Sequence, residues 1–406
     1  MHLWQILCSP RMLVAALMGF SCGVPLLLTL SLLQAWMRQE GVDLGTIGLY
    51  ALVGLPYTLK FLWAPLFDRY VPSRLGRRRG WLLLAQLLLI AAVAVLSGAA
   101  PRESPRMLAL AALAVAFFSA SQDIIVDAYR REDLADLELG LGSSLYVNGY
   151  RVGMLLAGSG GLILADHISF GQVYLFMAAS MALGVFTTLL CREPPLASGR
   201  PTSFQQAVLD PFAEYFRREQ ALVILAFILL YKLGDQMAST MTTPFYLDLG
   251  FSTSQIGTVV KLFGFWATLA GGFLGGLLLL RLGIASSLLL FGLLQALSTA
   301  GFSLLAWVGA SLPLLAGVIA CENLTSGMGT AAYVAFMASI TDRRFTATQY
   351  ALLSSLMGVP RVLAAAPTGY LAAWLGWPLF FLGCCLCALP GLLLLPRLQV
   401  LGKHSD

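Results

Sequence analysis

The chain alternates between long apolar runs and short polar connections. Each run is long enough to cross the apolar core of a bilayer as a helix, which takes about 20 residues. We therefore predict an all-α membrane protein with twelve transmembrane helices at 12–35, 45–66, 81–99, 107–128, 142–165, 172–191, 221–246, 254–280, 284–307, 312–340, 347–373 and 377–396. Several contain Gly or Pro, which membrane helices tolerate where neighbouring helices satisfy the backbone.

Basic residues are distributed unevenly between the connections. If the N-terminus is cytoplasmic, 17 of the 25 Lys and Arg residues lie in cytoplasmic segments and only Arg38, Arg102 and Arg106 lie outside. Positive charge favours the cytoplasmic side of a membrane protein. Both termini are therefore predicted to be cytoplasmic.

The longest connection divides the chain into two halves. We predict an N-terminal six-helix bundle at 1–191, a cytoplasmic linker at 192–220 and a C-terminal six-helix bundle at 221–406. The linker contains an amphipathic run that predicts a helix on the membrane surface. The halves also echo one another, because A-Y-R-R precedes the helix with Arg151 and T-D-R-R precedes the helix with Arg361. This echo resembles the parallel repeat of major-facilitator transporters, two bundles around a central cavity.

The composition excludes an ordinary soluble enzyme. The 406 residues are 58% hydrophobic and 11% charged, whereas soluble domains carry about 25% charged residues. The net charge of +5 does not indicate nucleic-acid binding, because the basic residues lie between spans. No Cys-x-x-Cys pair has His partners, so no metal is expected. No Walker A sequence is present, so ATP is not the expected energy source, and no cofactor is expected.

Charged residues inside the predicted spans are candidates for function, because a charge in lipid usually faces a partner or a cavity. Asp123 and Arg151 lie at similar depths and can pair, so Asp123 could take up and release a proton; a permanent ion pair is the alternative. Lys232 and Asp235 share one helix face. Asp127 lies one turn from Asp123 on the same predicted helix. The residues predicted to take part in proton coupling are Asp123, Asp127, Asp235 and Glu322.

A second group of residues is predicted to bind substrate. Arg361 has no local partner and suits an anionic group. Aromatic, amide and cationic side chains together suit a sugar with carboxylates, although aromatic residues near span ends can be interface anchors. The predicted substrate-binding residues are Gln34, Trp36, Gln122, Tyr146, Asn148, Tyr150, Arg151, Tyr231, Lys232, Lys261, Asn323 and Arg361.

The connection after the second span reads A-P-L-F-D-R-Y-V-P-S-R-L-G-R-R-R-G. It resembles the cytoplasmic signature loop of the major facilitator superfamily, without that signature's leading glycine. The resemblance implies a gating latch of charge pairs and helix-end contacts at Asp68, Arg69, Arg77 and Arg78, with Asp127 as the partner of Arg69. An ordinary positive connection is the alternative.

Motifs throughout the chain resemble the AmpG family of muropeptide permeases. They include L-L-Q-A-W-M at 32–37, K-F-L-W-A-P-L-F-D-R-Y at 60–70, S-A-S-Q-D-I at 119–124, G-Y-R-V-G-M-L at 149–155, L-Y-K-L-G-D at 230–235 and E-N-L-T-S-G-M-G-T at 322–330. The resemblance implies proton-coupled import of GlcNAc–1,6-anhydroMurNAc and its peptides for peptidoglycan recycling. In some bacteria these fragments also induce β-lactamase and so antibiotic resistance.

Two alternatives remain open from the sequence. Related permeases import ferric siderophores, and some members of the AmpG family have two additional C-terminal helices that this sequence lacks. A membrane-embedded sensor or enzyme is a further alternative, but no nucleophile–base pair is visible. We expect a monomer in the lipid bilayer with a small-molecule substrate and protons as partners, without catalytic activity or nucleic acid.

Overall fold

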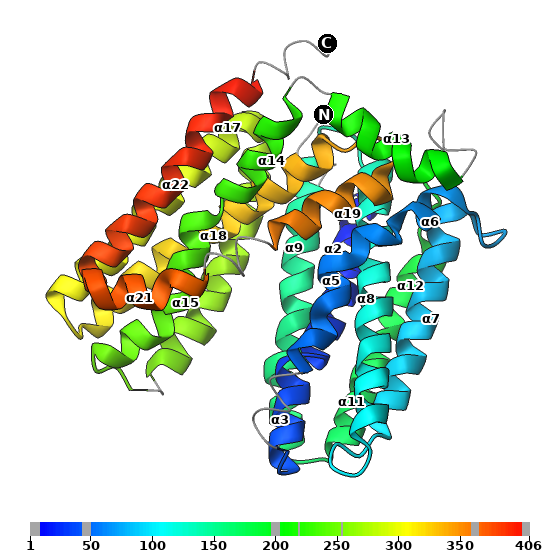
Figure 1. The fold of residues 1–406 in the computed structure, drawn as a ribbon, viewed down its shortest axis with the longest axis horizontal. Coiled ribbons are helices and arrows are strands. Elements are labelled where there is room, and N and C mark those ends of the chain that lie inside the picture. Colours follow the sequence, from blue (N-terminus) through cyan, green and yellow to red (C-terminus); the bar gives the residue numbers. More distant parts are fainter. Residues whose placement is uncertain are drawn as a thin grey trace. The chain divides into compact units, whose positions relative to one another are not determined.

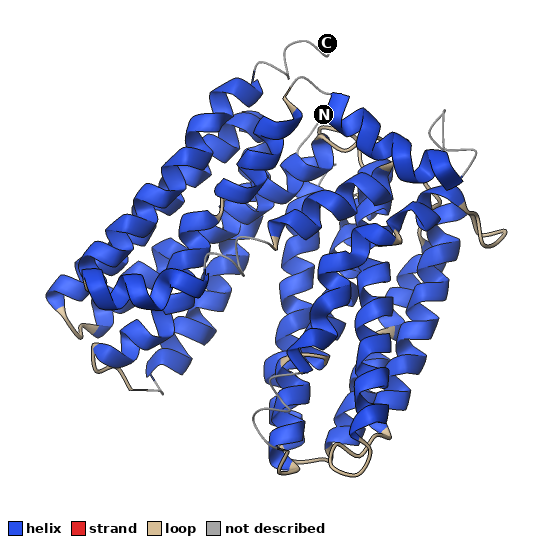
Figure 2. Cartoon of the chain, in the orientation of Figure 1, coloured by secondary structure: helices blue, strands red, loops and turns tan. Residues whose placement is uncertain are grey.

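The computed structural model describes residues 9–42, 50–195, 204–217, 220–252, 255–358 and 365–399. Within these residues all regular elements are helices, as Figure 2 shows. The chain forms two compact units: Met1–Phe212 with Ala338–Ser355, and Ala213–Met337 with Leu356–Asp406. The segment 338–355, which we predicted in the second bundle, thus packs with the first unit.

The first unit contains the predicted spans one to six, several of them divided into shorter pieces. Its elements are α2 (Pro10–Leu28), α3 (Ser31–Gln39), η1 (Tyr50–Gly54), α5 (Leu55–Leu59), η2 (Lys60–Leu62), α6 (Ala64–Arg69), α7 (Arg77–Ser97), α8 (Pro105–Asp133), α9 (Leu139–Leu155), η3 (Leu156–Gly160), α10 (Gly161–Ala165), α11 (Phe170–Ser180), α12 (Ala182–Leu190) and α19 (Thr346–Met357). The linker holds α13 (Phe204–Arg217), a helix in the region where the amphipathic run predicts one.

The second unit contains the remaining predicted spans except for residues 338–355. Its elements are α14 (Ala221–Leu230), α15 (Leu233–Asp248), η4 (Ile256–Phe263), α17 (Gly264–Val308), α18 (Leu312–Ser339), α21 (Ala365–Leu375) and α22 (Trp377–Gln399). Although α17 is one continuous element, Gly283 has a φ of 73° and breaks it between the two predicted spans. An L-residue with a side chain rarely adopts that backbone conformation.

Seven helical stretches of the described residues are long and apolar enough to cross a membrane. The longest, Ile256–Val308, covers two predicted spans. The predicted spans at 142–165 and 312–340 are not among these seven, and those at 45–66 and 347–373 include residues outside the described part of the chain.

Glycine allows one helix pair of the first unit to pack at backbone contact. Helices α2 and α9 lie against one another (Figure 1). A Cβ atom at Gly149 would lie 2.0 Å from the carbonyl oxygen of Ala16, and one at Gly19 would lie 2.0 Å from that of Tyr146. Small residues permit such close approach between membrane helices. This contact holds the polar face of α9 close to α2 and α8.

Candidate functional site

The first unit contains a fully buried group of ion pairs, here called the Arg78 cluster (Asp68, Arg77, Arg78, Glu132, Thr346 and Thr348). The Arg78 guanidinium donates to Asp68 Oδ1 at 2.8 Å and to Glu132 Oε2 at 2.9 Å. Arg77 Nη2 donates to Glu132 Oε1 at 2.8 Å. Charge-assisted hydrogen bonds of this kind are stronger than neutral ones.

The Arg78 cluster also holds the first turn of α19. Asp68 Oδ2 accepts from the backbone N–H of Thr348 at 2.9 Å and from its hydroxyl at 2.8 Å. The N–H of Ala347 donates to Asp68 Oδ1 at 3.2 Å, and Thr346 hydrogen-bonds to Glu132. A carboxylate at a helix N-terminus satisfies N–H groups that lack helical partners and interacts favourably with the helix dipole. The cluster therefore fixes α19 to the first unit.

One predicted partner of this region is wrong. Asp127 pairs with Arg130, three residues further along α8, at 3.2 Å, and not with Arg69. The Arg69 guanidinium lies over the ring of Tyr70 at 5.4 Å. Because Asp127 and Arg130 lie one turn apart on α8, they meet without any movement of α6.

Asp123 lies one turn before Asp127, on the N-terminal side of α8, and is 7% exposed. Its Oδ1 has no hydrogen-bond partner among the described residues. The buried Lys60 of η2 is a cation that interacts with Asp123 and with Asp127 at longer range.

Two other residues place polar groups near Asp123. The Cys22 thiol of α2 lies against its carboxyl, and the Gln122 amide donates to Cys22 Sγ at 3.4 Å. None of these neighbours forms a direct ion pair with Asp123. The group can therefore change protonation without the loss of a salt bridge.

In the second unit, the predicted pair of Lys232 and Asp235 lies where one span is interrupted. Helix α14 ends at Leu230 and α15 begins at Leu233. Lys232 Nζ lies 3.5 Å from Asp235 Oδ2 and donates to Gln295 Oε1 of α17 at 2.8 Å. Interrupted membrane helices commonly form transporter binding sites.

Glu322 of α18 lies in the same unit and is bound by hydroxyl groups. Its carboxyl contacts the hydroxyl of Ser298, and both oxygens lie 3.3 Å from Thr299 Oγ1. Ser298 also contacts Thr325 Oγ1 at 2.9 Å. A small cavity beside it is lined by Tyr231, Gly234, Asp235, Gly292, Gln295, Ala296, Thr299, Cys384, Ala388 and Leu392.

The other predicted substrate residues have varied surroundings. Trp36 is buried in the core of the first unit, stacked on Phe170 with ring centroids 5.8 Å apart. The Tyr231 hydroxyl donates to the carbonyl of Leu288, and Asn323 Oδ1 accepts from Thr268 at 2.8 Å. Gln34, Asn148, Tyr150 and Arg151 are half-buried, Lys261 is exposed, and Arg361 lies outside the described residues.

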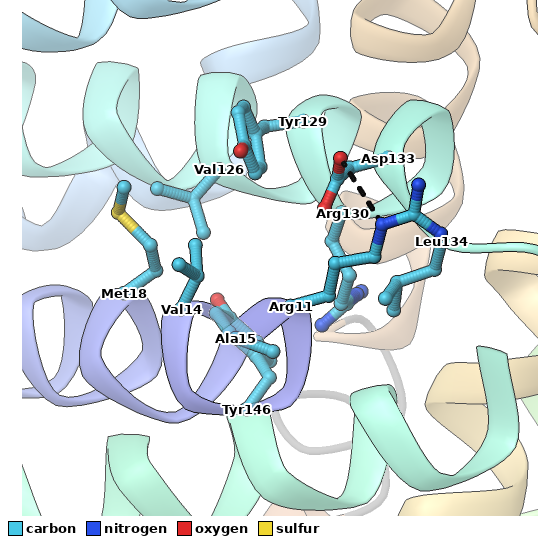
Figure 3. A pocket seen from close by; sticks show the side chains of 10 residues that line it. All are labelled: Arg11, Val14, Ala15, Met18, Val126, Tyr129, Arg130, Asp133, Leu134 and Tyr146. Carbon is cyan, nitrogen blue, oxygen red and sulfur yellow. Dashed lines mark ion pairs between the residues drawn. The ribbon is translucent and has the colours of Figure 1, made fainter. Parts of the chain in front are cut away.

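A second cavity lies between α2, α8 and α9. Figure 3 shows its lining, with the ion pair between Arg11 Nε and Asp133 Oδ1 at 3.9 Å on one side. The buried Arg130 guanidinium lies 4.2 Å from the centre of the Tyr146 ring and donates to the Tyr350 hydroxyl at 2.8 Å. Arg130 thus joins α8, α9 and α19 within the first unit.

Sequence reasoning missed several of these residues. Lys60 is not among the predicted site residues, and Glu132 lies beyond the predicted span 107–128. The run R-R-E-D at 130–133 was the available signal, since Arg and Glu close together at a span end favour an ion-pair group. No sequence signal singles out Gln295, Ser298 or Thr299, which are ordinary polar residues of an apolar helix.

Comparison with known proteins gives consistent results. A model of the Major Facilitator Superfamily matches residues 12–365. The chain is 42% identical to the anhydromuropeptide permease of Escherichia coli K12 over 393 residues, which cover 96% of this chain and 80% of that protein. It is 33% identical to putative transporter AmpG 1 of Rickettsia bellii, over 94% of this chain and 97% of the relative.

The fold is also similar to that of solved transporters. The E. coli fucose:proton symporter FucP matches with a TM-score of 0.73 at 13% identity, over 95% of this chain and 98% of that one. The proton:xylose symporter XylE matches with a TM-score of 0.70 at 12% identity, over 95% and 94%.

Proposed function

The chain belongs to the Major Facilitator Superfamily of membrane transporters, and from this premise we propose that it imports cell-wall muropeptides together with protons. The substrates are GlcNAc–1,6-anhydroMurNAc and its peptides. The observation that carries the proposal is the similarity to the anhydromuropeptide permease of E. coli, which extends over nearly the whole chain. The protein acts in the bacterial inner membrane with both termini cytoplasmic, in agreement with the distribution of Lys and Arg.

Asp123 is the proposed proton carrier of the first unit. It is buried on α8, it has no direct ion pair, and one carboxylate oxygen has no hydrogen-bond partner among the described residues. An ionised carboxylate in such a place is costly, and protonation removes that cost. The buried Lys60 also interacts with Asp123 at longer range, so we propose that movement of Lys60 accompanies transfer of the proton between Asp123 and solvent.

The Arg78 cluster is the proposed latch. Its contacts to α19 come from a part of the chain about 280 residues away from Asp68. Every contact between the carboxylates and α19 is a hydrogen bond that can break when α19 moves, while the pairs of Arg78 with Asp68 and Glu132 stay within residues 68–132. The latch can therefore open without leaving a buried charge unpaired.

The proposal is tested by uptake of labelled GlcNAc–anhydroMurNAc peptide into right-side-out vesicles, with and without an imposed pH gradient. We expect accumulation that an uncoupler abolishes. A folded, inserted protein without uptake would contradict the substrate assignment, and labelled ferric siderophore in the same vesicles would then test the alternative import function.

Asp123→Asn is expected to abolish gradient-driven accumulation, so that the inside-to-outside ratio falls to about 1, while exchange of labelled for unlabelled substrate persists. The reason is that an amide can fill the site but cannot release a proton. Asp166→Asn, at an exposed position between α10 and α11, is the matched control. Normal accumulation by Asp123→Asn would remove Asp123 from the coupling mechanism.

A further inference from the structure

Glu322 is a buried carboxyl group whose direct partners are all uncharged. It is 8% exposed on α18, and among the described residues its hydrogen bonds go to Ser298 and Thr299 of α17. A buried carboxylate is normally paired with a cation. Lys232, a described cation that interacts with Glu322 at longer range, is instead bound to Gln295 at 2.8 Å and to Asp235 at 3.5 Å.

The hydroxyl groups around Glu322 carry fewer protons than there are oxygen atoms within hydrogen-bond distance of them. Ser298 and Thr299 each lie within hydrogen-bond distance of the carbonyl oxygen of Gln295, at 2.9 and 3.0 Å. Thr325 lies 2.9 Å from the carbonyl oxygen of Cys321. Ser and Thr in helices commonly donate to such carbonyls in the preceding turn. A hydroxyl carries one proton, so a hydroxyl that bonds in this way cannot also donate to Glu322.

A proton on Glu322 resolves this shortage. The carboxylic acid then donates to Ser298 Oγ, and the hydroxyls keep their bonds to the backbone carbonyls. When the proton leaves, the hydroxyls of Ser298 and Thr299 can rotate and donate to the carboxylate that remains. The same side chains thus accommodate both charge states of Glu322 by rotation of hydroxyl groups, without a change of helix position.

The surroundings provide a route for that proton. Thr299 contacts Glu322 and also lines the small cavity that Asp235 and Gln295 line. The Nε2 atom of Gln295 is buried and has no hydrogen-bond partner among the described residues, so it can bind water there. The other titratable groups facing Glu322 are Tyr246 of α15 and Cys385 of α22, and neither is a cation.

We propose that Glu322 is a second proton-binding site, located in the second unit and separate from Asp123, which exchanges its proton with the cavity at the interruption between α14 and α15. The step is a proton transfer from the carboxylic acid to water or to the Asp235 carboxylate, and no other bond is made or broken. The proton site itself does not depend on the proposed function. Its consequence, the movement of two protons with each substrate molecule, rests on that function.

The protonated state is tested on purified protein in detergent, without any substrate. Infrared difference spectra between high and low pH report the carbonyl stretch of protonated carboxyl groups. We expect that one band of the wild type is absent from Glu322→Gln and present in Glu103→Gln, a control at an exposed position. Glu322→Asp retains a carboxyl and should show the band at a shifted position. Identical spectra for wild type and Glu322→Gln would overturn the proposal.

The consequence is tested in vesicles with the membrane potential collapsed and a pH gradient of one unit. Because each proton contributes a factor of ten at equilibrium, two protons allow about 100-fold accumulation and one proton about 10-fold. We expect about 100-fold for the wild type and about 10-fold for Glu322→Gln. A wild-type limit of about 10-fold, or an unchanged limit in Glu322→Gln, would refute two-proton coupling through Glu322.

The two experiments distinguish the failure of this inference from the failure of the proposed function. If no muropeptide enters the vesicles, the substrate assignment fails while the infrared result still decides whether Glu322 binds a proton. If Glu322→Gln does not fold, the shifted band of Glu322→Asp still decides whether Glu322 binds a proton.

Discussion

Glu132 in the first unit and Glu322 in the second are both buried glutamates near the ends of hydrogen-bond networks, yet their partners differ in charge. Glu132 accepts from Arg77 and Arg78 at 2.8 and 2.9 Å. Glu322 contacts only the hydroxyls of Ser298 and Thr299. Two guanidinium groups stabilise the ionised form of Glu132, whereas hydroxyl groups can act as donors or acceptors and accommodate either form of Glu322.

This difference separates two functions of buried carboxyl groups. A carboxylate with direct cationic partners keeps its charge and fixes elements in place, as Asp68 and Glu132 do for α19. A carboxyl group without a direct cation is free to gain and lose a proton, as we propose for Asp123 and Glu322. The identity of the nearest donor therefore indicates the role better than depth or burial does.

The largest effect is expected from Arg78→Met. It removes the cation shared by Asp68 and Glu132 while it preserves much of the side-chain volume. Loss of one partner from a buried ion pair costs about 3–5 kcal/mol. We expect a markedly lower thermal unfolding temperature in detergent. Arg102→Met, at an exposed position between α7 and α8, is the control. Equal unfolding temperatures for both variants would show that the cluster contributes nothing to stability.

A smaller effect is expected from Thr348→Val, which removes one hydroxyl from Asp68 and leaves the backbone hydrogen bond of residue 348 intact. A hydrogen bond to a charged group contributes about 1.5–3 kcal/mol. The free energy of unfolding, measured by denaturant titration in detergent, should fall by an amount in this range. A change below about 0.5 kcal/mol would indicate that Asp68 is not ionised there.

The smallest effect is expected from Ser298→Ala, which removes a hydroxyl from Glu322. If Glu322 is protonated, the lost bond is between neutral groups and contributes about 0.5–1.5 kcal/mol. The same denaturant titration at neutral pH should therefore give a smaller loss than Thr348→Val. A larger loss than that of Thr348→Val would mean that Glu322 is ionised and would reverse the comparison.

Much of the fold could be predicted from local sequence. The apolar runs predicted where the helices lie, and the break at Gly283 separates the spans predicted at 254–280 and 284–307. The i,i+3 spacing of Lys232 and Asp235 predicted their contact, found at 3.5 Å. These features depend on residues that lie close together in sequence.

Partners from distant parts of the chain could not be assigned in this way. Asp68, for example, accepts from the backbone N–H of Thr348, which lies 280 residues away in sequence. Likewise, helix α8 continues to Asp133 and brings Glu132 to Arg78, 54 residues away in sequence. The spacing of residues in the sequence gives the depth of a side chain in the membrane and the helix face on which it lies. Several cations share each depth, so spacing alone does not identify the partner of a carboxylate.

The sequence by itself determined the all-helical membrane architecture and the positions of most spans, because apolar length and charge cost act locally on each segment. Only the tertiary structure decided that Asp68 holds the N-terminus of α19, and that Glu322 is bound by hydroxyls of α17. The reason is that a hydrogen bond depends on the distance and direction between two atoms. These are set by the packing of helices and not by the spacing of residues along the chain.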